Sequence, residues 1–202
     1  MIYTGDKVLN FDTIKKEISS LMDEERFLHS VGVMELSSDL AKIYGIDTEK
    51  AAFAGLIHDA AKRLPQKTQF DLMQKAYANL PHDEIVFKNV ALWHGPAGAV
   101  YVKEKYGVDD EIYDAVFYHT IGRENMSLLE KIIFIADIIE VNRDSEFDWA
   151  KDVREVSKKD LDKALLTVLD KSIVSIIKRG LILHPNSILL RNEILRRKNE
   201  SR

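Results

Sequence analysis

The chain has 202 residues, an apolar share of 46%, a charged share of 31% and a formal net charge of -4. That length is sufficient for one well-filled core, and the small net charge gives no electrostatic case for nucleic acid or an anionic membrane as a partner. The chain contains no cysteine. This excludes disulfides, thiolate metal sites and a cysteine nucleophile, so any metal must be held by imidazole and carboxylate groups.

No stretch of the sequence predicts export or insertion into a membrane. The first ten residues lack the apolar segment of a signal peptide. No apolar run reaches the roughly 18 residues that a membrane-spanning helix needs. The longest run, from Ile132 to Ile139, is interrupted by Asp137. We therefore expect a cytoplasmic protein.

Apolar residues recur mainly at helical spacing, and only four prolines and nine glycines occur. Gly45 and Gly107 follow apolar stripes as helix stops, and Pro185 suits a first helical turn. Residues 142–151 are predicted to form a loop, and Ser157 with Asp160 resembles a capping box. The expected helices cover residues 14–21, 33–44, 49–63, 66–79, 83–92, 97–106, 109–119, 127–141, 157–180 and 186–197.

The pattern predicts an all-α fold of about ten helices, because no strand-like alternation of useful length occurs. We expect residues 1–202 to form a single domain. Its metal-binding core would cover about residues 25–145, with the C-terminal helices of residues 157–197 packing on it.

The pair His58-Asp59 lies in a run of small and aliphatic residues from Ala54 to Lys62. A buried carboxylate beside an imidazole is costly unless something pairs with it, and one metal ion would explain both residues. Neighbours on a helix point about 100° apart, so the two side chains can flank an ion that lies between their directions. The small residues around them let other helices approach with further ligands.

Asp137 is the second ionisable residue in an apolar setting, between Lys131 and Glu140. Aspartate is a poor residue for the interior of a helix and is almost never fully buried without a partner. Two interpretations stay open: a buried salt bridge to a lysine or arginine, and a metal carboxylate.

The six histidines form the remaining pool of imidazole ligands: His29, His58, His82, His94, His119 and His184. A lone histidine in a helical protein is usually a surface residue or a satisfied core residue. His29 faces inward one turn before Val33, however, and His119 ends an apolar stretch. His94 precedes Gly95-Pro96, where backbone can approach a ligand closely. Together with the two aspartates, these positions are difficult to explain as independent core residues.

The order His29, His58-Asp59, Asp137 resembles the metal-binding motif of the HD-domain metal-dependent phosphohydrolases. The surrounding segments resemble the bacterial YqeK-type symmetrical dinucleoside tetraphosphatases from about Glu25 to Arg191. Those segments are residues 26–33, 41–47, 50–62, 93–99, 118–123 and 125–133. The resemblance implies the HD-domain helical fold, an iron-containing site, and symmetrical hydrolysis of diadenosine tetraphosphate to two ADP by a metal-activated water.

The resemblance assigns His29, His58, Asp59 and Asp137 to the metal. We expect Asp59 and Lys62 to act in catalysis. The imidazole and carboxylate donors suit a divalent metal. The family favours iron, and manganese, cobalt and zinc are chemically compatible with the same donors. Two roles for His94 and His119 stay open. They bind either a second metal bridged by Asp59 or the phosphates of the substrate.

A nucleotide substrate needs cations and hydrogen-bond donors near the metal. Arg26 and Lys62 lie one helical turn from expected ligands. Most of the other candidates belong to or follow the segments that carry the expected ligands. His184 lies in the segment of residues 182–185, where it could stack on a base. For each cationic side chain the alternative interpretation is an ordinary solvent-exposed surface charge. The expected substrate contacts are Arg26, Lys62, His94, His119, Thr120, Arg123, Arg143 and His184.

The sequence departs from the family at Val141, where the family usually has a proline, and residues 144–151 lack its Pro-Gly turn. The departure falls on one wall of the expected pocket and bears on substrate preference.

Two other functions stay open: another nucleotide phosphohydrolase, such as a nucleotidase or a guanosine tetraphosphate hydrolase, and a non-catalytic nucleotide sensor. The oligomeric state also stays open, with a homodimer as one arrangement.

Overall fold

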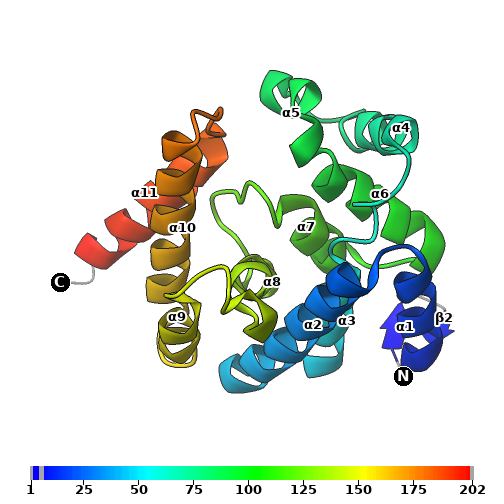
Figure 1. Ribbon diagram of the computed structural model, residues 1–202, viewed down its shortest axis with the longest axis horizontal. Helices are drawn as coiled ribbons and strands as arrows, with labels where there is room; N and C mark the ends of the chain where they lie inside the picture. The colour runs from blue at the N-terminus through cyan, green and yellow to red at the C-terminus, as the bar shows by residue number, and fades with distance from the viewer. Residues whose placement is uncertain (1, 5–6, 201–202) are drawn as a thin grey trace.

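The computed structural model describes residues 2–4 and 7–200, which form an all-helical fold with one small N-terminal hairpin (Figure 1). The hairpin pairs β1 (Ile2–Thr4) antiparallel with β2 (Lys7–Leu9), which the sequence pattern did not predict. The helices are α1 (Phe11–Ser20), α2 (Glu24–Tyr44), α3 (Thr48–Ile57), α4 (Gln66–Ala76), α5 (Glu84–Lys88), η1 (Val90–Leu92), α6 (His94–Tyr106), α7 (Asp110–Tyr118), α8 (Leu128–Ile139), η2 (Val141–Arg143), α9 (Ala150–Ser157), α10 (Leu161–Lys178) and α11 (Pro185–Glu200).

Helices α2, α3 and α8 pack together in the middle of the molecule (Figure 1). The backbones of α2 and α3 approach closely at Gly55, where an added Cβ would lie 2.9 Å from the Cα of Met34. Real Cβ atoms essentially never come that close, so this crossing depends on glycine. It brings His29 on α2 beside His58 at the end of α3.

Three apolar clusters hold the helices together. One joins α1, α2, α3, α6 and α7, and a smaller one lies beneath α4, α5 and α6. The third joins α2 and α8 to the C-terminal helices α9, α10 and α11, which therefore pack on the helices that carry the predicted ligands. That all 202 residues form one domain stays a prediction. Among the described helices, none has the length and apolarity that crossing a membrane requires.

The predicted helix over residues 49–63 is too long, because α3 ends at Ile57. After it the N–H of Ala60 donates to the carbonyl of Ile57 at 3.0 Å, and that of Lys62 donates to Asp59 at 2.9 Å. These bonds span three residues instead of the four of an α-helix. The His58-Asp59 pair therefore lies where the helix gives way to tight turns, not in its middle.

The predicted helix over residues 157–180 is found as α10, but its start at Ser157 and its capping box are wrong. Ser157 ends α9, and its hydroxyl donates back to the carbonyl of Arg154. Asp160 alone caps α10, accepting a hydrogen bond from the N–H of Lys163 at 2.9 Å. Helix α9 begins at Ala150, within the segment predicted as a loop.

Other predicted boundaries shift as well, and α2 begins at Glu24 instead of residue 33. The helix predicted over residues 83–92 divides into α5 and η1, because the side chain of Asn89 caps a new turn by accepting from the N–H of Ala91. Helix α6 begins at His94 instead of residue 97, with Pro96 in its first turn, where a missing N–H costs nothing. The stops at Gly45 and Gly107 are confirmed, since both adopt a φ of 70°.

Candidate metal centre

His58 directs one unpaired nitrogen into the interior. Its Nδ1 donates to the carbonyl of Gly55, one turn back, at 2.7 Å. This bond fixes the ring so that Nε2 carries a lone pair, and Nε2 is buried with no hydrogen-bond partner. A buried polar atom without a partner is rare, and here it faces a group of further histidines and carboxylates.

His29, on α2, lies between two carboxylates. Its Nδ1 is 3.1 Å from Oε1 of Glu140, and its Nε2 is 3.0 Å from Oδ1 of Asp137. Burial would lower the pKa of His29, but hydrogen bonds to Asp137 and Glu140 outweigh it and raise the pKa to about 9. A neutral imidazole donates from only one nitrogen, so one of these contacts needs an added proton or a cation between its two atoms.

Asp59 and Asp137 complete the group. His58 Nε2 lies 3.4 Å from Oδ1 of Asp137 and 3.9 Å from Oδ2 of Asp59. Burial alone would raise the pKa of both aspartates, but the neighbouring histidines hold both pKa values well below the usual range. Arg143 approaches Asp137 no closer than 3.8 Å, so histidines, not an arginine or a lysine, are the nearest partners of this carboxylate.

The four residues predicted as metal ligands thus come together from α2, α8 and the tight turns that follow α3. Donor atoms of His29, His58 and Asp59 lie within 4.8 Å of one another, as do those of His58, His119 and Asp137. Imidazole and carboxylate donors in this number suit a divalent transition metal. The unpaired Nε2 of His58 is the observation that a bound ion would explain.

A second group lies on the other side of Asp59. Oδ1 of this carboxylate is 3.4 Å from Nε2 of His94 and 3.6 Å from Nε2 of His119. The two imidazoles are 3.1 Å apart, and Nδ1 of His119 donates to the carbonyl of Val116. The ammonium of Lys62 lies 2.8 Å from Nε2 of His94. Asp59 therefore faces one group of potential donor atoms with each of its oxygens.

Besides Lys62, His94 and His119, three further predicted substrate contacts lie beside the centre. Arg26 Nη1 lies 2.5 Å from Oδ2 of Asp59, and Arg143 stands near Asp137. The hydroxyl of Thr120 is buried without a hydrogen-bond partner, and it lies 3.4 Å from where a Cβ on Gly95, the residue after His94, would be. A cleft of about 190 Å³ opens beside the centre, with Arg26, His29 and Arg143 among the residues that line it.

Two predicted substrate contacts lie on protein partners instead. Arg123 Nε is 2.7 Å from Oε1 of Glu130, its Nη2 is 2.8 Å from Asp114, and its guanidinium covers the ring of Tyr118. His184 Nε2 is 2.8 Å from Oδ2 of Asp83. Within the described contacts, neither side chain reaches a predicted metal ligand.

Sequence reasoning missed Glu140, whose carboxylate is fully buried behind His29. It also accepts from the N–H of Asn142 at 2.7 Å. An added Cβ at Gly32 would lie 2.1 Å from Oε2 of Glu140, so only glycine there leaves room for the carboxylate. The available signal was a glutamate three residues after Asp137, at the end of the same helix.

The HD domain family matches residues 26–142 of the chain. This protein belongs to the HD domain family. It is 40% identical to the symmetrical bis(5'-nucleosyl)-tetraphosphatase of Halalkalibacterium halodurans over 175 residues, which cover 86% of this chain and 91% of the relative. It is 37% identical to the protein of that name from Bacillus subtilis over 87% of this chain and 92% of the relative.

The fold has a solved counterpart as well. A crystal structure from Clostridium acetobutylicum, described as a predicted HD superfamily hydrolase involved in NAD metabolism, superposes with a TM-score of 0.87 at 40% identity. The superposition covers 95% of this chain and all of the other. These relatives cover nearly the whole chain, and they confirm the fold class and the family that the sequence motifs indicated.

Proposed function

We propose that this protein is a metal-dependent hydrolase that cleaves dinucleoside tetraphosphates symmetrically, so that diadenosine tetraphosphate yields two ADP. The observation that carries the proposal is the buried His29, His58, Asp59 and Asp137 cluster, with its unpaired His58 Nε2. The chain that holds this cluster is 40% identical to a relative named for that reaction.

We propose that these four residues hold one divalent ion, in the cell iron, although manganese, cobalt and zinc accept the same donors. When bound, such an ion lowers the pKa of a water and polarises a phosphoryl oxygen. Glu140 fixes the ring of His29, and the carbonyl of Gly55 fixes that of His58, so both imidazoles are oriented before the ion arrives.

For His94 and His119 we propose phosphate binding instead of a second metal. The ammonium of Lys62 already lies 2.8 Å from His94 and would repel a further cation. Burial, with Lys62 and His119 nearby, lowers the pKa of His94 well below its usual range, so this imidazole is neutral. Its Nε2 then accepts a hydrogen bond from the Lys62 ammonium, which leaves the proton on Nδ1 to be donated to a phosphate oxygen.

Arg26 and Arg143 border the cluster on the cleft side, and guanidinium groups match phosphate oxygens with two parallel hydrogen bonds. We assign both to the polyphosphate chain, with the Thr120 hydroxyl as a further donor. Asp59 stays the proposed catalytic carboxylate, because its two oxygens face both groups. Lys62 is proposed to donate a hydrogen bond to the leaving phosphate oxygen. We assign Arg123 and His184 to structural contacts.

A substrate panel tests the proposal. Purified protein is supplied with ferrous iron or manganese and given diadenosine tetraphosphate, mononucleotides, guanosine tetraphosphate and NAD. We expect diadenosine tetraphosphate to be hydrolysed with the highest kcat/KM. A higher value for a mononucleotide, for guanosine tetraphosphate or for NAD would replace the proposed substrate. No turnover with any divalent metal would favour a nucleotide sensor.

A further inference from the structure

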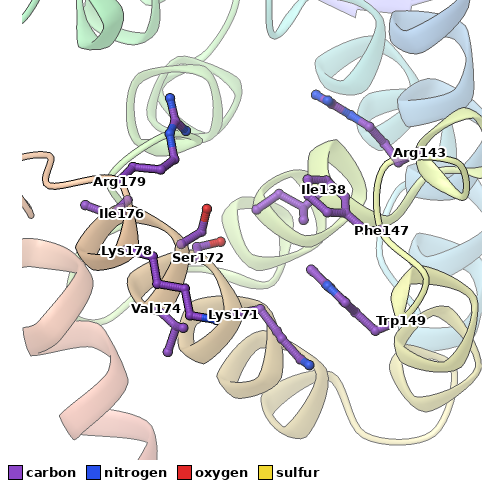
Figure 2. Close-up of a pocket in the computed structure, with 11 residues that line it drawn as sticks. Ile138, Arg143, Phe147, Trp149, Lys171, Ser172, Val174, Ile176, Lys178 and Arg179 are labelled. Carbon is purple, nitrogen blue, oxygen red and sulfur yellow. The ribbon is translucent and has the colours of Figure 1, made fainter.

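A groove of about 690 Å³ runs between α10 and the segment that follows α8 (Figure 2). Arg143, Phe147 and Trp149 stand on one side of it. Lys171, Lys178 and Arg179 project from α10 on the other side. The volume is in the range of sites that take small organic ligands. The proposed hydrolysis, as described so far, uses none of these residues except Arg143.

Two aromatic rings form the apolar part of the groove. The ring centroids of Phe147 and Trp149 are 5.2 Å apart, with an interplanar angle of 31°. Both side chains are only half-buried, and the ammonium of Lys171 lies 5.7 Å from the centroid of Trp149. Half-exposed aromatic rings can stack on the flat face of a nucleobase, whichever base it is.

The charged part of the groove is cationic. Its lining includes Arg143, Lys171, Lys178 and Arg179, and no carboxylate is among the described residues that line it. The three cations on α10 are exposed, and a cationic wall next to stacking rings matches a ligand that has both a base and a phosphate.

The groove is continuous with the metal centre. Arg143 lines both this groove and the cleft beside the cluster, and its Nη2 is 3.8 Å from Oδ1 of Asp137. Ile138, the residue after Asp137, lines the groove as well. A polyphosphate held at the cluster can therefore extend past Arg143 into the groove without leaving the protein surface.

We propose that the groove binds one of the two nucleoside ends of the dinucleoside substrate, with its base on Trp149 and Phe147 and its adjoining phosphate near Lys171. This rests on the proposed function, because only a substrate with a nucleoside at each end needs a second base site. The wall that departs from the family pattern, after Val141, is the wall that carries both rings.

Kinetics of Trp149→Ala test the proposal. We expect its KM for diadenosine tetraphosphate to rise about tenfold, as loss of one stacked base predicts, with kcat within twofold of wild type. The inhibition constant of inorganic tripolyphosphate, which has no base, stays unchanged. Trp149→Phe keeps a stacking ring and restores most of the KM. An unchanged KM, or an equal rise in KM and in the tripolyphosphate constant, overturns the proposal.

Fluorescence separates this proposal from the proposed function, because it needs no turnover. The difference in emission between wild type and Trp149→Phe reports on Trp149, and we expect ADP, but not ribose 5-phosphate, to quench it saturably. Quenching without any hydrolysis would leave the groove site standing and refute the proposed function. Symmetrical hydrolysis without quenching would refute the groove site. Emission that follows protein concentration instead of ADP would assign the groove to a second copy of the chain, which also overturns the proposal.

Discussion

The metal centre and the ion cluster around Arg123 are both rich in charge, but their atoms are paired differently. In the Arg123 cluster a guanidinium lies between two carboxylates, 2.7 Å from Glu130 and 2.8 Å from Asp114. In the metal centre, imidazoles and carboxylates converge and Nε2 of His58 has no partner. In the first arrangement one guanidinium forms ion pairs with both carboxylates, whereas in the second several imidazole nitrogens converge on the same two carboxylates, as the ligands of a metal do. The difference distinguishes a structural cluster from a ligand site.

Asp137→Asn should have the largest effect. The variant removes one carboxylate charge from the cluster at nearly constant volume, so we expect loss of bound metal and a fall in kcat of about a thousandfold or more. Transition-state stabilisation by a metal is worth several kcal/mol, and about 1.4 kcal/mol is tenfold in rate. Metal analysis and steady-state kinetics measure both. The matched control is Asp114→Asn in the Arg123 cluster, which should keep its metal. Equal metal content in the two variants would remove the distinction between the clusters.

Glu140→Gln should have the next largest effect, through the orientation of His29. Loss of such a partner of a metal ligand typically costs about 10- to 100-fold in metal affinity or activity. Gly32→Ala should act in the same direction, because its Cβ would displace the same carboxylate. Competition with a chromogenic chelator measures the affinity. An affinity within twofold of wild type in both variants would show that Glu140 does not position the ligand.

Arg123→Met should reduce stability without touching the metal. It leaves the buried carboxylate of Glu130 with only its helix-capping hydrogen bond from the N–H of Ser127. We expect the free energy of unfolding in urea to fall by about 2 kcal/mol, in the range for a buried polar group that loses its partner. Metal content and KM should stay at wild-type values. A raised KM at unchanged stability would show that Arg123 binds the substrate.

Lys50→Met should have the smallest effect, because this lysine bridges Asp109 and Glu111 at the surface. We expect a loss below about 1 kcal/mol at pH 7. Burial would raise the pKa of Asp109, but the hydrogen bond from Lys50 outweighs it and lowers the pKa. The stabilisation is therefore present above the ordinary pKa of the carboxyl and is lost as pH falls through the lowered one. Urea titrations at pH 7 and pH 3 should show the difference between variant and wild type shrinking at low pH.

The residues of the buried cluster could be predicted from the sequence because a charged group in an apolar helix has few explanations. This reasoning identified His58, Asp59 and Asp137. The order of these residues along the chain, after His29, matched a known motif. The end of α3 could not be predicted in the same way. The tight turns that follow Ile57 interrupt an apolar pattern that continues to residue 61.

Contacts between distant segments set the remaining limits. The position of Arg123 after His119 suggested phosphate binding, but Glu130, which also caps α8, lies close enough to pair with it. The role of Glu140 depends on the approach of α2 to η2, and the groove depends on α10 facing Phe147 and Trp149. Neither approach leaves a periodic signal in the sequence.

Hydrolysis of diadenosine tetraphosphate in water enriched in ¹⁸O tests the central claim most directly. We expect ADP as the only nucleotide product, with one labelled oxygen on the β-phosphate of one of the two ADP molecules from each cleavage. ATP and AMP as products, or ADP that carries no label, would contradict it.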